Sequence, residues 1–186
     1  MKTLIINNHS NYIKELVSLF SDVVIIDKQT LTKDFNITNY DLIVLSGGSN
    51  VPTVLRHPEE YIYEISIIKE SKIPVLGICL GAEIICEAYG GKLQELTEEH
   101  RGVITLQITN LDLEKALGVS NLEVTEGHHI GIQGIPQDFI SCAHSEHGIE
   151  IIKHKDKPII GFQFHPEVSN NKKLLDWVFK TLDLTN

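Results

Sequence analysis

VLGICLGAEII, residues 75–85, decides the expected fold, because an apolar run meets a Gly-x-Cys-x-Gly turn and then an apolar helical pattern. A cysteine at such a strand-to-helix junction is the thiol counterpart of the Gly-x-Ser-x-Gly nucleophile elbow. The flanking glycines keep Cβ atoms out of a turn whose backbone angles are unfavourable for other residues. The positive N-terminal end of the following helix favours the thiolate. The stretch predicts Cys79 as a nucleophile, although a small buried core cysteine fits this pentad alone equally well.

Apolar runs on both sides of this stretch alternate with segments of helical periodicity. Three runs without polar interruption are typical of strands covered on both faces: residues 3–6, 23–26 and 42–45. Helical spacing occupies residues 11–20 and 58–71, and a further helix follows the elbow to about Tyr89. This alternation predicts right-handed crossovers and an α/β fold whose open sheet is mostly parallel and flanked by helices.

The second half of the chain has a different pattern, in which polar and apolar residues alternate as in strands with one wet face. The strands expected there are residues 103–108, 122–125, 139–144, 149–154 and 159–164. The last two resemble a hairpin, and an amphipathic helix is expected at residues 172–182. We therefore expect a small antiparallel excursion within a single domain, residues 1–186, since no repeat or long linker interrupts the sequence.

Charge and composition narrow the classes of function. Asp and Glu number 25 against 16 Lys and Arg, for a formal net charge of −9, which argues against non-specific binding to nucleic acid or anionic membranes. No signal peptide and no run long enough to cross a bilayer is present, so we expect a cytoplasmic protein. The cysteines, Cys79, Cys86 and Cys142, show no disulfide pattern, and the last two are expected in the core.

The segment SGGSNVP, residues 46–52, follows the third expected strand and is the first that could approach the elbow. A glycine pair at the carboxyl end of a parallel strand lies where open α/β sheets bind ligands. The amide of Gly48 could donate to a developing oxyanion beside the amide of Leu80. A plain turn is the alternative, and a P-loop is not supported because the Gly-Lys-Ser/Thr ending is missing.

The segment FQFHPE, residues 162–167, offers a general base with an orienting carboxylate. His165 ends an expected strand, and Glu167 follows two positions later, with Pro166 limiting the freedom between them. In this hypothesis His165 takes the thiol proton and later returns a proton to a leaving amine, while Glu167 holds its tautomer. An ordinary strand exit is the alternative interpretation.

The segment EGHHIG, residues 126–131, contains the adjacent histidines His128 and His129. No spacing of cysteine and histidine resembles a structural zinc site, and adjacent side chains of a regular strand cannot readily share one ion. The isolated histidines elsewhere, His144, His147 and His154, do not change this interpretation. We therefore expect no metal site and no cofactor.

The three motifs together resemble the class I, or triad, glutamine amidotransferases over nearly the whole chain, in order and in separation. Resemblance implies a flavodoxin-like glutaminase fold, in which glutamine forms a γ-glutamyl thioester with Cys79, ammonia leaves, and water releases glutamate. It also implies His165 as general base and acid, Glu167 as its partner, and oxyanion amides from Gly48 and Leu80. The expected substrate contacts are Gly47, Asn50, Glu83, Gly127, His128 and His129.

Residues 77–91 and 154–168 look most like the separate glutaminase subunit of archaeal-type GMP synthases. This resemblance implies a separate ATP-dependent synthetase as ammonia acceptor. The glutaminases of anthranilate and aminodeoxychorismate synthases share the same core and are alternatives. Two further alternatives are a stand-alone hydrolase of another γ-glutamyl compound and a non-catalytic binding protein.

The chain departs from the family pattern at three places. Glu83 replaces the usual glutamine four residues after the nucleophile, where a negative charge would repel a substrate carboxylate and raise the thiol pKa. Ser49 and Asn50 stand where proline and often glycine follow the glycine pair, although Asn tolerates a left-handed backbone. Residues 127–130 lack the serine and the acidic residue of the Ser-His-x-Asp pattern of GMP synthases.

Overall fold

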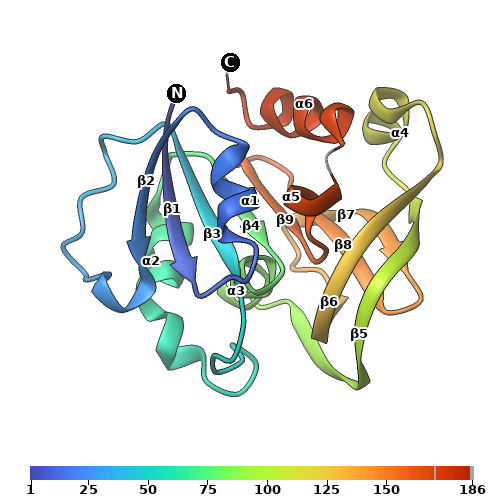
Figure 1. The fold of residues 1–186 in the computed structure, drawn as a ribbon. Helices are drawn as coiled ribbons and strands as arrows, with labels where there is room; N and C mark the ends of the chain where they lie inside the picture. Colours follow the sequence, from blue (N-terminus) through green and yellow to red (C-terminus); the bar gives the residue numbers. More distant parts are fainter. Residues whose placement is uncertain (170, 185–186) are drawn as a thin grey trace.

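The computed structural model describes residues 1–169 and 171–184, and these contain a nine-stranded sheet in the order β2-β1-β3-β4-β9-β8-β6-β5-β7 (Figure 1). Its parallel half consists of β1 (Lys2–Asn8), β2 (Asp22–Asp27), β3 (Leu42–Gly48), β4 (Val75–Ile78) and β9 (Ile159–Phe162). Its antiparallel half consists of β5 (Lys92–Ile108), β6 (Asn121–Gly134), β7 (Phe139–Ser145) and β8 (Gly148–His154).

The parallel half has the flavodoxin-like strand order, in which the first strand lies between the second and the third. Its strands alternate between two apolar layers, because successive side chains of a strand point to opposite faces. Ile5 and Val44 contribute to one layer, whereas Leu4 and Leu45 contribute to the other. The apolar runs at residues 3–6 and 42–45 therefore correspond to strands that are buried on both faces.

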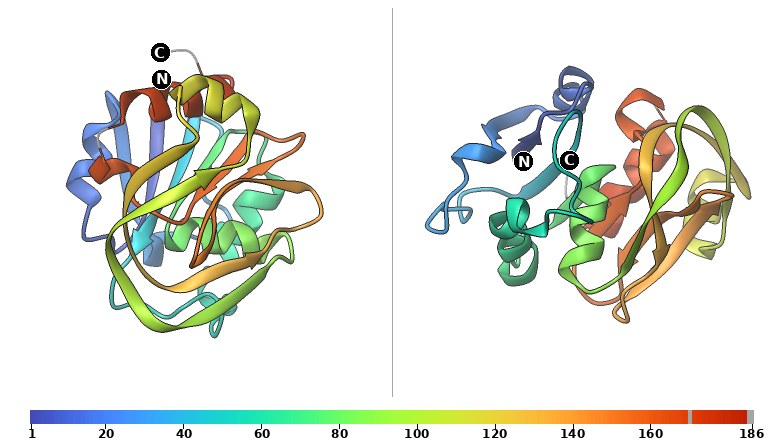
Figure 2. Two further views of the ribbon diagram at one scale, coloured as in Figure 1. Left: turned by 90° about the vertical axis from the view of Figure 1, so that its right-hand side faces the viewer. Right: turned by 90° about the horizontal axis from the view of Figure 1, so that it is seen from below.

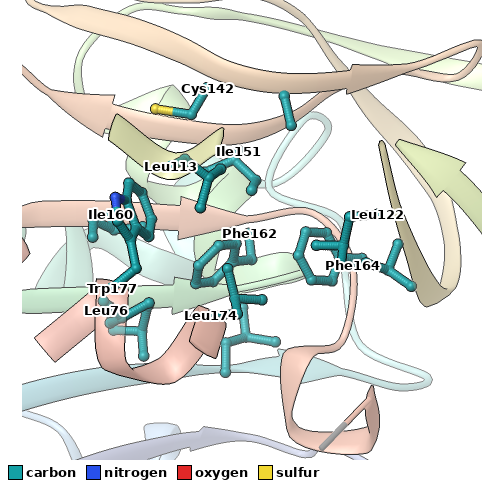
Figure 3. Packing of buried hydrophobic residues seen from close by; sticks show 14 of the residues in the cluster. Leu76, Leu113, Leu122, Cys142, Ile151, Ile160, Phe162, Phe164, Leu174 and Trp177 are labelled. Carbon is teal, nitrogen blue, oxygen red and sulfur yellow. The ribbon is translucent and has the colours of Figure 1, made fainter. Parts of the chain in front are cut away.

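Helices cover the two faces of the sheet as separate layers. The helical segments are α1 (Ile13–Ser18), η1 (Lys28–Thr30), η2 (Pro58–Tyr61), α2 (Ile62–Glu70), α3 (Leu80–Ala88), α4 (Leu111–Leu117), α5 (Pro166–Ser169) and α6 (Lys172–Thr181). Side chains of α1, α4 and α6 pack in one apolar cluster, and those of α2 and α3 in the other. Figure 3 shows the first cluster, where Trp177 and Leu174 of α6 lie beside Ile160 and Phe162 of β9.

The antiparallel half is larger than the small excursion that the sequence predicted. β5 and β6 form one long antiparallel ribbon, in which Lys92 pairs with Gly134 at one end and Gln107 with Asn121 at the other (Figure 2). Residues 92–102 carry mostly exposed polar side chains, so their strand gives no hydrophobic signal in the sequence. The α/β class is confirmed, but the sheet is divided nearly evenly between parallel and antiparallel strands.

Two further predictions need correction. β2 lies at the edge of the sheet and has no buried residue, with Ile25 47% exposed, so this strand is not covered on both faces. The short helix α4 was not predicted, although Asn110 caps its first turn and Gly118 ends it with φ 76°.

The cysteines Cys86 and Cys142 are free and buried, as expected. Among the described residues, no helix is long and apolar enough to cross a membrane.

Candidate active site

The turn between β4 and α3 holds Cys79 in a backbone conformation that side chains rarely adopt, with φ 51° and ψ −108°. A Cβ added at Gly77 would lie 2.5 Å from the carbonyl oxygen of Gly81, and one at Gly81 would overlap the carbonyl oxygen of Leu45. Both glycines are therefore required by close backbone approach. The amide of Cys79 donates to the carbonyl of Phe162 at 2.7 Å, which fixes the elbow to β9.

The chain leaves β9 through His165 and enters α5, which places Glu167 beside the imidazole. His165 Nδ1 lies 2.8 Å from Glu167 Oε1, and both residues are buried. The amide of His165 donates to the carbonyl of Thr125 at 2.9 Å, so the antiparallel half also holds this segment. The ring of Tyr12 packs edge-on against the imidazole, with 4.8 Å between ring centroids.

Gly47 lies between the cysteine and the histidine. A Cβ added there would lie 3.0 Å from Cε1 of His165 and 3.5 Å from Cβ of Cys79. The two side chains thus approach the same point from the ends of different strands, and a side chain at position 47 would crowd the His165 ring. The structure therefore brings Cys79, His165 and Glu167 together at the carboxyl end of the parallel strands, where α/β sheets bind ligands.

The two amides expected to bind an oxyanion also lie at the elbow. The amide of Leu80 forms a hydrogen bond to the Cys79 sulfur that acts to lower the pKa of this thiol. A Cβ added at Gly48 would overlap Cδ2 of Leu80, so these two residues are in direct contact. Gly48, Cys79 and Leu80 border the same cavity.

The environment of the sulfur differs from the sequence-based expectation of a stabilised thiolate. Burial raises the pKa of Cys79 well above its usual range, and the charge of Glu83 raises it further, against the lowering by the Leu80 amide. The helix N-terminus is present, but low polarity and a nearby carboxylate outweigh it. Burial and the charge of Glu83 therefore favour the protonated thiol over the thiolate.

Glu83 points inward from α3 and is 4% exposed. Burial raises its pKa to about 7, opposed by a hydrogen bond from Gln163 and by the charge of His128. Gln163 Nε2 donates to Glu83 Oε1 at 3.0 Å. Near neutral pH a large share of Glu83 is therefore an uncharged carboxylic acid, which resembles an amide in shape and hydrogen bonding.

Two adjoining cavities lie at this edge of the sheet. The outer cleft has a volume of about 280 Å³ and is bordered by His165, together with Asn50 and His129. The inner cavity has a volume of about 50 Å³, reaches Cys79 and Glu83, and is bordered by His128. Gly48 and Gly127 line both cavities. All of the residues predicted for the site thus lie in or beside these two spaces, and Asn50 has the left-handed conformation, φ 55°.

Several polar residues of the site escaped prediction from the sequence. Gln163 lies within the motif that supplied His165, but only the structure shows that it reaches Glu83. Glu99 and Arg101 form an ion pair of 2.7 Å at the outer cleft, on a part of β5 without a hydrophobic pattern. Two groups of side chains could hold a metal ion: His100, Glu126 and His147, and Glu126, His128 and Glu150.

The fold and the three converging residues define a class: an α/β protein arranged as a cysteine–histidine–glutamate hydrolase. The family model described as glutamine amidotransferase class-I matches residues 4–184. The chain belongs to the class-I glutamine amidotransferase family. The family resemblance carried by the three motifs, and the prediction of an enzyme of this family, are confirmed.

Three relatives illustrate the match. The A subunit of the glutamine-hydrolysing GMP synthase of Methanobrevibacter smithii is 31% identical over 179 residues, covering 93% of this chain and 90% of that protein. The glutamine-hydrolysing GMP synthase of Spiroplasma kunkelii is 37% identical over 142 residues, which are 76% of this chain but only 27% of that longer protein. A crystal structure of a candidate GMP synthase A subunit from Thermoplasma acidophilum superposes with a TM-score of 0.81, at 23% identity, over 98% of this chain and 94% of the other.

Proposed function

We propose that this single-domain chain is a cytoplasmic glutaminase subunit, which hydrolyses glutamine and delivers ammonia to a separate ATP-dependent synthetase of the GMP synthase type. One observation carries the proposal: Cys79, in its strained elbow, and the His165–Glu167 pair approach one point across Gly47. A nucleophile, a base and an orienting carboxylate in this relation suit acyl transfer through a thioester.

The reaction begins when His165 accepts the proton of Cys79 and the sulfur attacks the side-chain amide carbon of glutamine. The amides of Gly48 and Leu80 donate to the oxyanion that develops. His165, held by Glu167, then gives its proton to the leaving nitrogen, and ammonia departs from the γ-glutamyl thioester. Water activated by the same imidazole hydrolyses the thioester and releases glutamate.

The two cavities suit the two ends of such a substrate. The inner cavity, of about 50 Å³, is the smaller of the two and reaches Cys79, so we place the side-chain amide of glutamine there. The outer cleft carries one carboxylate, Glu99, and one guanidinium, Arg101. Opposite charges at the mouth are complementary to the ammonium and carboxylate groups of a free amino acid.

The separate synthetase is supported by the extents of the relatives. This chain covers most of a protein named as the A subunit of a GMP synthase, and only about a quarter of a longer protein named as GMP synthase. Ammonia released without an acceptor would be wasted, so we expect the isolated chain to have low activity. No contact with nucleic acid or membrane forms part of this proposal.

Glu83 favours one alternative, a stand-alone hydrolase of another γ-glutamyl compound. This alternative depends on a charged Glu83 that repels the carboxylate of glutamine. Burial, which raises the pKa of Glu83 to about 7, instead allows an uncharged side chain in the place of the family's glutamine. The alternative predicts turnover of γ-glutamyl amines without any partner.

The test measures glutamate release from glutamine with and without the synthetase subunit encoded by the same organism. We expect the rate of glutamate release to rise at least about ten-fold when the synthetase, ATP and the synthetase's own substrate are present. A γ-glutamyl thioester on Cys79 should be trapped by acid quench and mass spectrometry. Cys79→Ser is the control, and it should abolish both signals while leaving the fold intact.

Absence of thioester and of glutamate release in both conditions would contradict the glutaminase proposal. Rapid turnover of γ-glutamyl amines by the chain alone, with no response to the synthetase, would favour the stand-alone hydrolase.

A further inference from the structure

A group of charged side chains is buried in the antiparallel half, next to the inner cavity. Glu126 and His128 come from β6, Glu150 from β8, and His147 from the turn between β7 and β8. Glu126 is 1% exposed, His128 4% and Glu150 0%. We call these four residues the Glu/His cluster. Buried carboxylates are costly unless hydrogen bonds or cations satisfy them, so this arrangement needs a physical explanation.

The cluster contains polar atoms that lack hydrogen-bond partners among the described residues. Glu126 Oε1, His147 Nδ1 and Glu150 Oε2 are buried and make no hydrogen bond within residues 1–169 and 171–184. His147 Nδ1 lies 2.8 Å from Glu126 Oε1, but the orientation of the two groups does not make a hydrogen bond. Two lone pairs at this distance suit a cation that binds both.

The tautomer of His128 leaves one of its nitrogens available to a cation. Its Nδ1 lies 2.8 Å from the carbonyl oxygen of Ile130, and a carbonyl can only accept, so Nδ1 carries a proton. Its Nε2 lies 3.1 Å from Glu126 Oε2. Metal-binding histidines typically donate their other ring N–H to a carbonyl or carboxylate, as His128 does here.

His100 is the remaining histidine beside the cluster, and its geometry excludes it as a ligand of the same ion as His147. The two rings stack with 3.5 Å between centroids and 17° between planes. Lone pairs in nearly parallel, stacked planes do not converge, so one ion cannot lie in both ring planes.

We propose that Glu126, His128 and Glu150 bind a divalent transition-metal ion of the Zn²⁺ class, with His147 Nδ1 as a fourth ligand. The available atoms of the first three lie within 4.8 Å of one another, and bonds of about 2.0–2.2 Å require only small side-chain adjustments. Mixed imidazole and carboxylate ligands suit Zn²⁺ better than the all-oxygen sites of Mg²⁺ or Ca²⁺. The ion links β6 to β8 behind the inner cavity.

This site differs from the histidine pair considered in the sequence. His129 is exposed and His128 is buried, so the adjacent histidines point apart as the strand alternation requires. The ligands come instead from β6, β8 and the preceding turn, which no short spacing in the sequence reveals. None of its ligands belongs to the proposed triad, but His128 also borders the inner cavity, so the test measures metal binding directly and does not use glutaminase activity as its readout.

The test titrates Zn²⁺ into chelator-treated, desalted protein by isothermal titration calorimetry. We expect one saturable equivalent, a rise in melting temperature, and, with Co²⁺ in place of Zn²⁺, a visible absorption band of a nitrogen- and oxygen-bound ion. Glu150→Gln and His147→Ala should each weaken binding at least about ten-fold. The matched control is Glu64→Gln, which alters a buried carboxylate of α2 and should leave the affinity unchanged.

Lack of a saturable equivalent in the wild-type protein would overturn the proposal. Equal affinity in the wild type and His147→Ala would also overturn it, even if Glu150→Gln failed to fold. His147 is a useful position for this test, because its side chain is partly exposed and its ring lies at the edge of the cluster, 2.8 Å from Glu126 Oε1.

Discussion

Two histidine–glutamate pairs lie beside the same cavities, one in each half of the sheet. In the parallel half His165 Nδ1 lies 2.8 Å from Glu167 Oε1, and in the antiparallel half His128 Nε2 lies 3.1 Å from Glu126 Oε2. The partners are two positions apart in both pairs, and all four residues are buried. The pairs thus share spacing and burial, but they run in opposite order along the chain and use different ring nitrogens.

The surroundings of the imidazoles separate the pairs. The ring of His165 borders the outer cleft and approaches Cβ of Cys79 across Gly47, which is the position that the proposed mechanism requires of a base. In the ring of His128, Nδ1 faces the carbonyl oxygen of Ile130 and Nε2 faces Glu126, where the proposed ion would bind. A histidine–carboxylate pair therefore suits catalysis where one nitrogen faces a nucleophile, and suits structure or cation binding where both nitrogens face acceptors.

The largest expected effect is that of Glu167→Gln. Glutamine has nearly the same size, but it removes the charge that stabilises the imidazolium and holds its tautomer. We expect kcat for glutamine hydrolysis to fall about 10²–10⁴-fold, with KM changed much less. The measurement is steady-state glutamate release with the synthetase present.

Glu126→Gln makes the same change in the other pair and sharpens the comparison. Because Glu126 has no contact with Cys79 or His165 in the proposed mechanism, kcat should fall at most about ten-fold. Equal losses in the two variants would show that the pairs are not distinguished by their surroundings.

A smaller effect, of about 3 kcal/mol or more on the free energy of unfolding, is expected for Gly81→Ala. The added Cβ would overlap the carbonyl oxygen of Leu45 and lie 2.8 Å from its Cβ, so α3 must move away from β3. Urea denaturation measures the change through the midpoint. Gly127→Ala in the antiparallel half is the control, since its Cβ would meet nothing within 4 Å and the unfolding free energy should change by less than about 1 kcal/mol. Similar losses in both variants would contradict the tight packing inferred at the elbow.

The same contrast explains what could be predicted from the sequence. Uninterrupted apolar runs and the glycine-flanked Cys79 have strong local signals, so the parallel strands, the elbow and the position of His165 after β9 were recognisable. Family resemblance then connected segments far apart in the chain. The half-exposed edge strand β2 was misjudged, because exposure depends on strand order and not on its own composition.

The antiparallel half has weaker local signals. Residues 92–102 of β5 are mostly polar and exposed, and only pairing with β6 makes them a strand. Glu126 and Glu150 are ordinary acidic residues in the sequence, yet register buries both of them beside His128. These charges are buried by the pairing of strands that are distant in the sequence, and such pairing leaves no periodic pattern there. The Glu/His cluster could therefore only be found in the structure.

The smallest effect concerns the buried carboxylate of Glu83. Burial raises its pKa to about 7 from the ordinary 4.5, so the folded state binds a proton more tightly than the unfolded chain. The resulting stability is complete below pH 4.5 and is lost as the pH rises through 7, by at most about 3 kcal/mol. Glu83→Gln cannot lose a proton, and its stability relative to the wild type should therefore increase between pH 4.5 and 7.

Glu64→Gln is the matched control, because burial also raises the pKa of Glu64 to about 7, on α2. Both variants should change the pH dependence of unfolding alike in urea titrations. Only Glu83→Gln should lower the pKa of Cys79, since the charge of Glu83 raises the pKa of this thiol and Glu64 is not among its causes. The readout is the pH profile of iodoacetamide labelling at Cys79, followed by peptide mass spectrometry. If both variants shift this labelling profile equally, the charge of Glu83 does not act directly on the sulfur of Cys79. Protonation of Glu83 is then not required for this sulfur to attack glutamine.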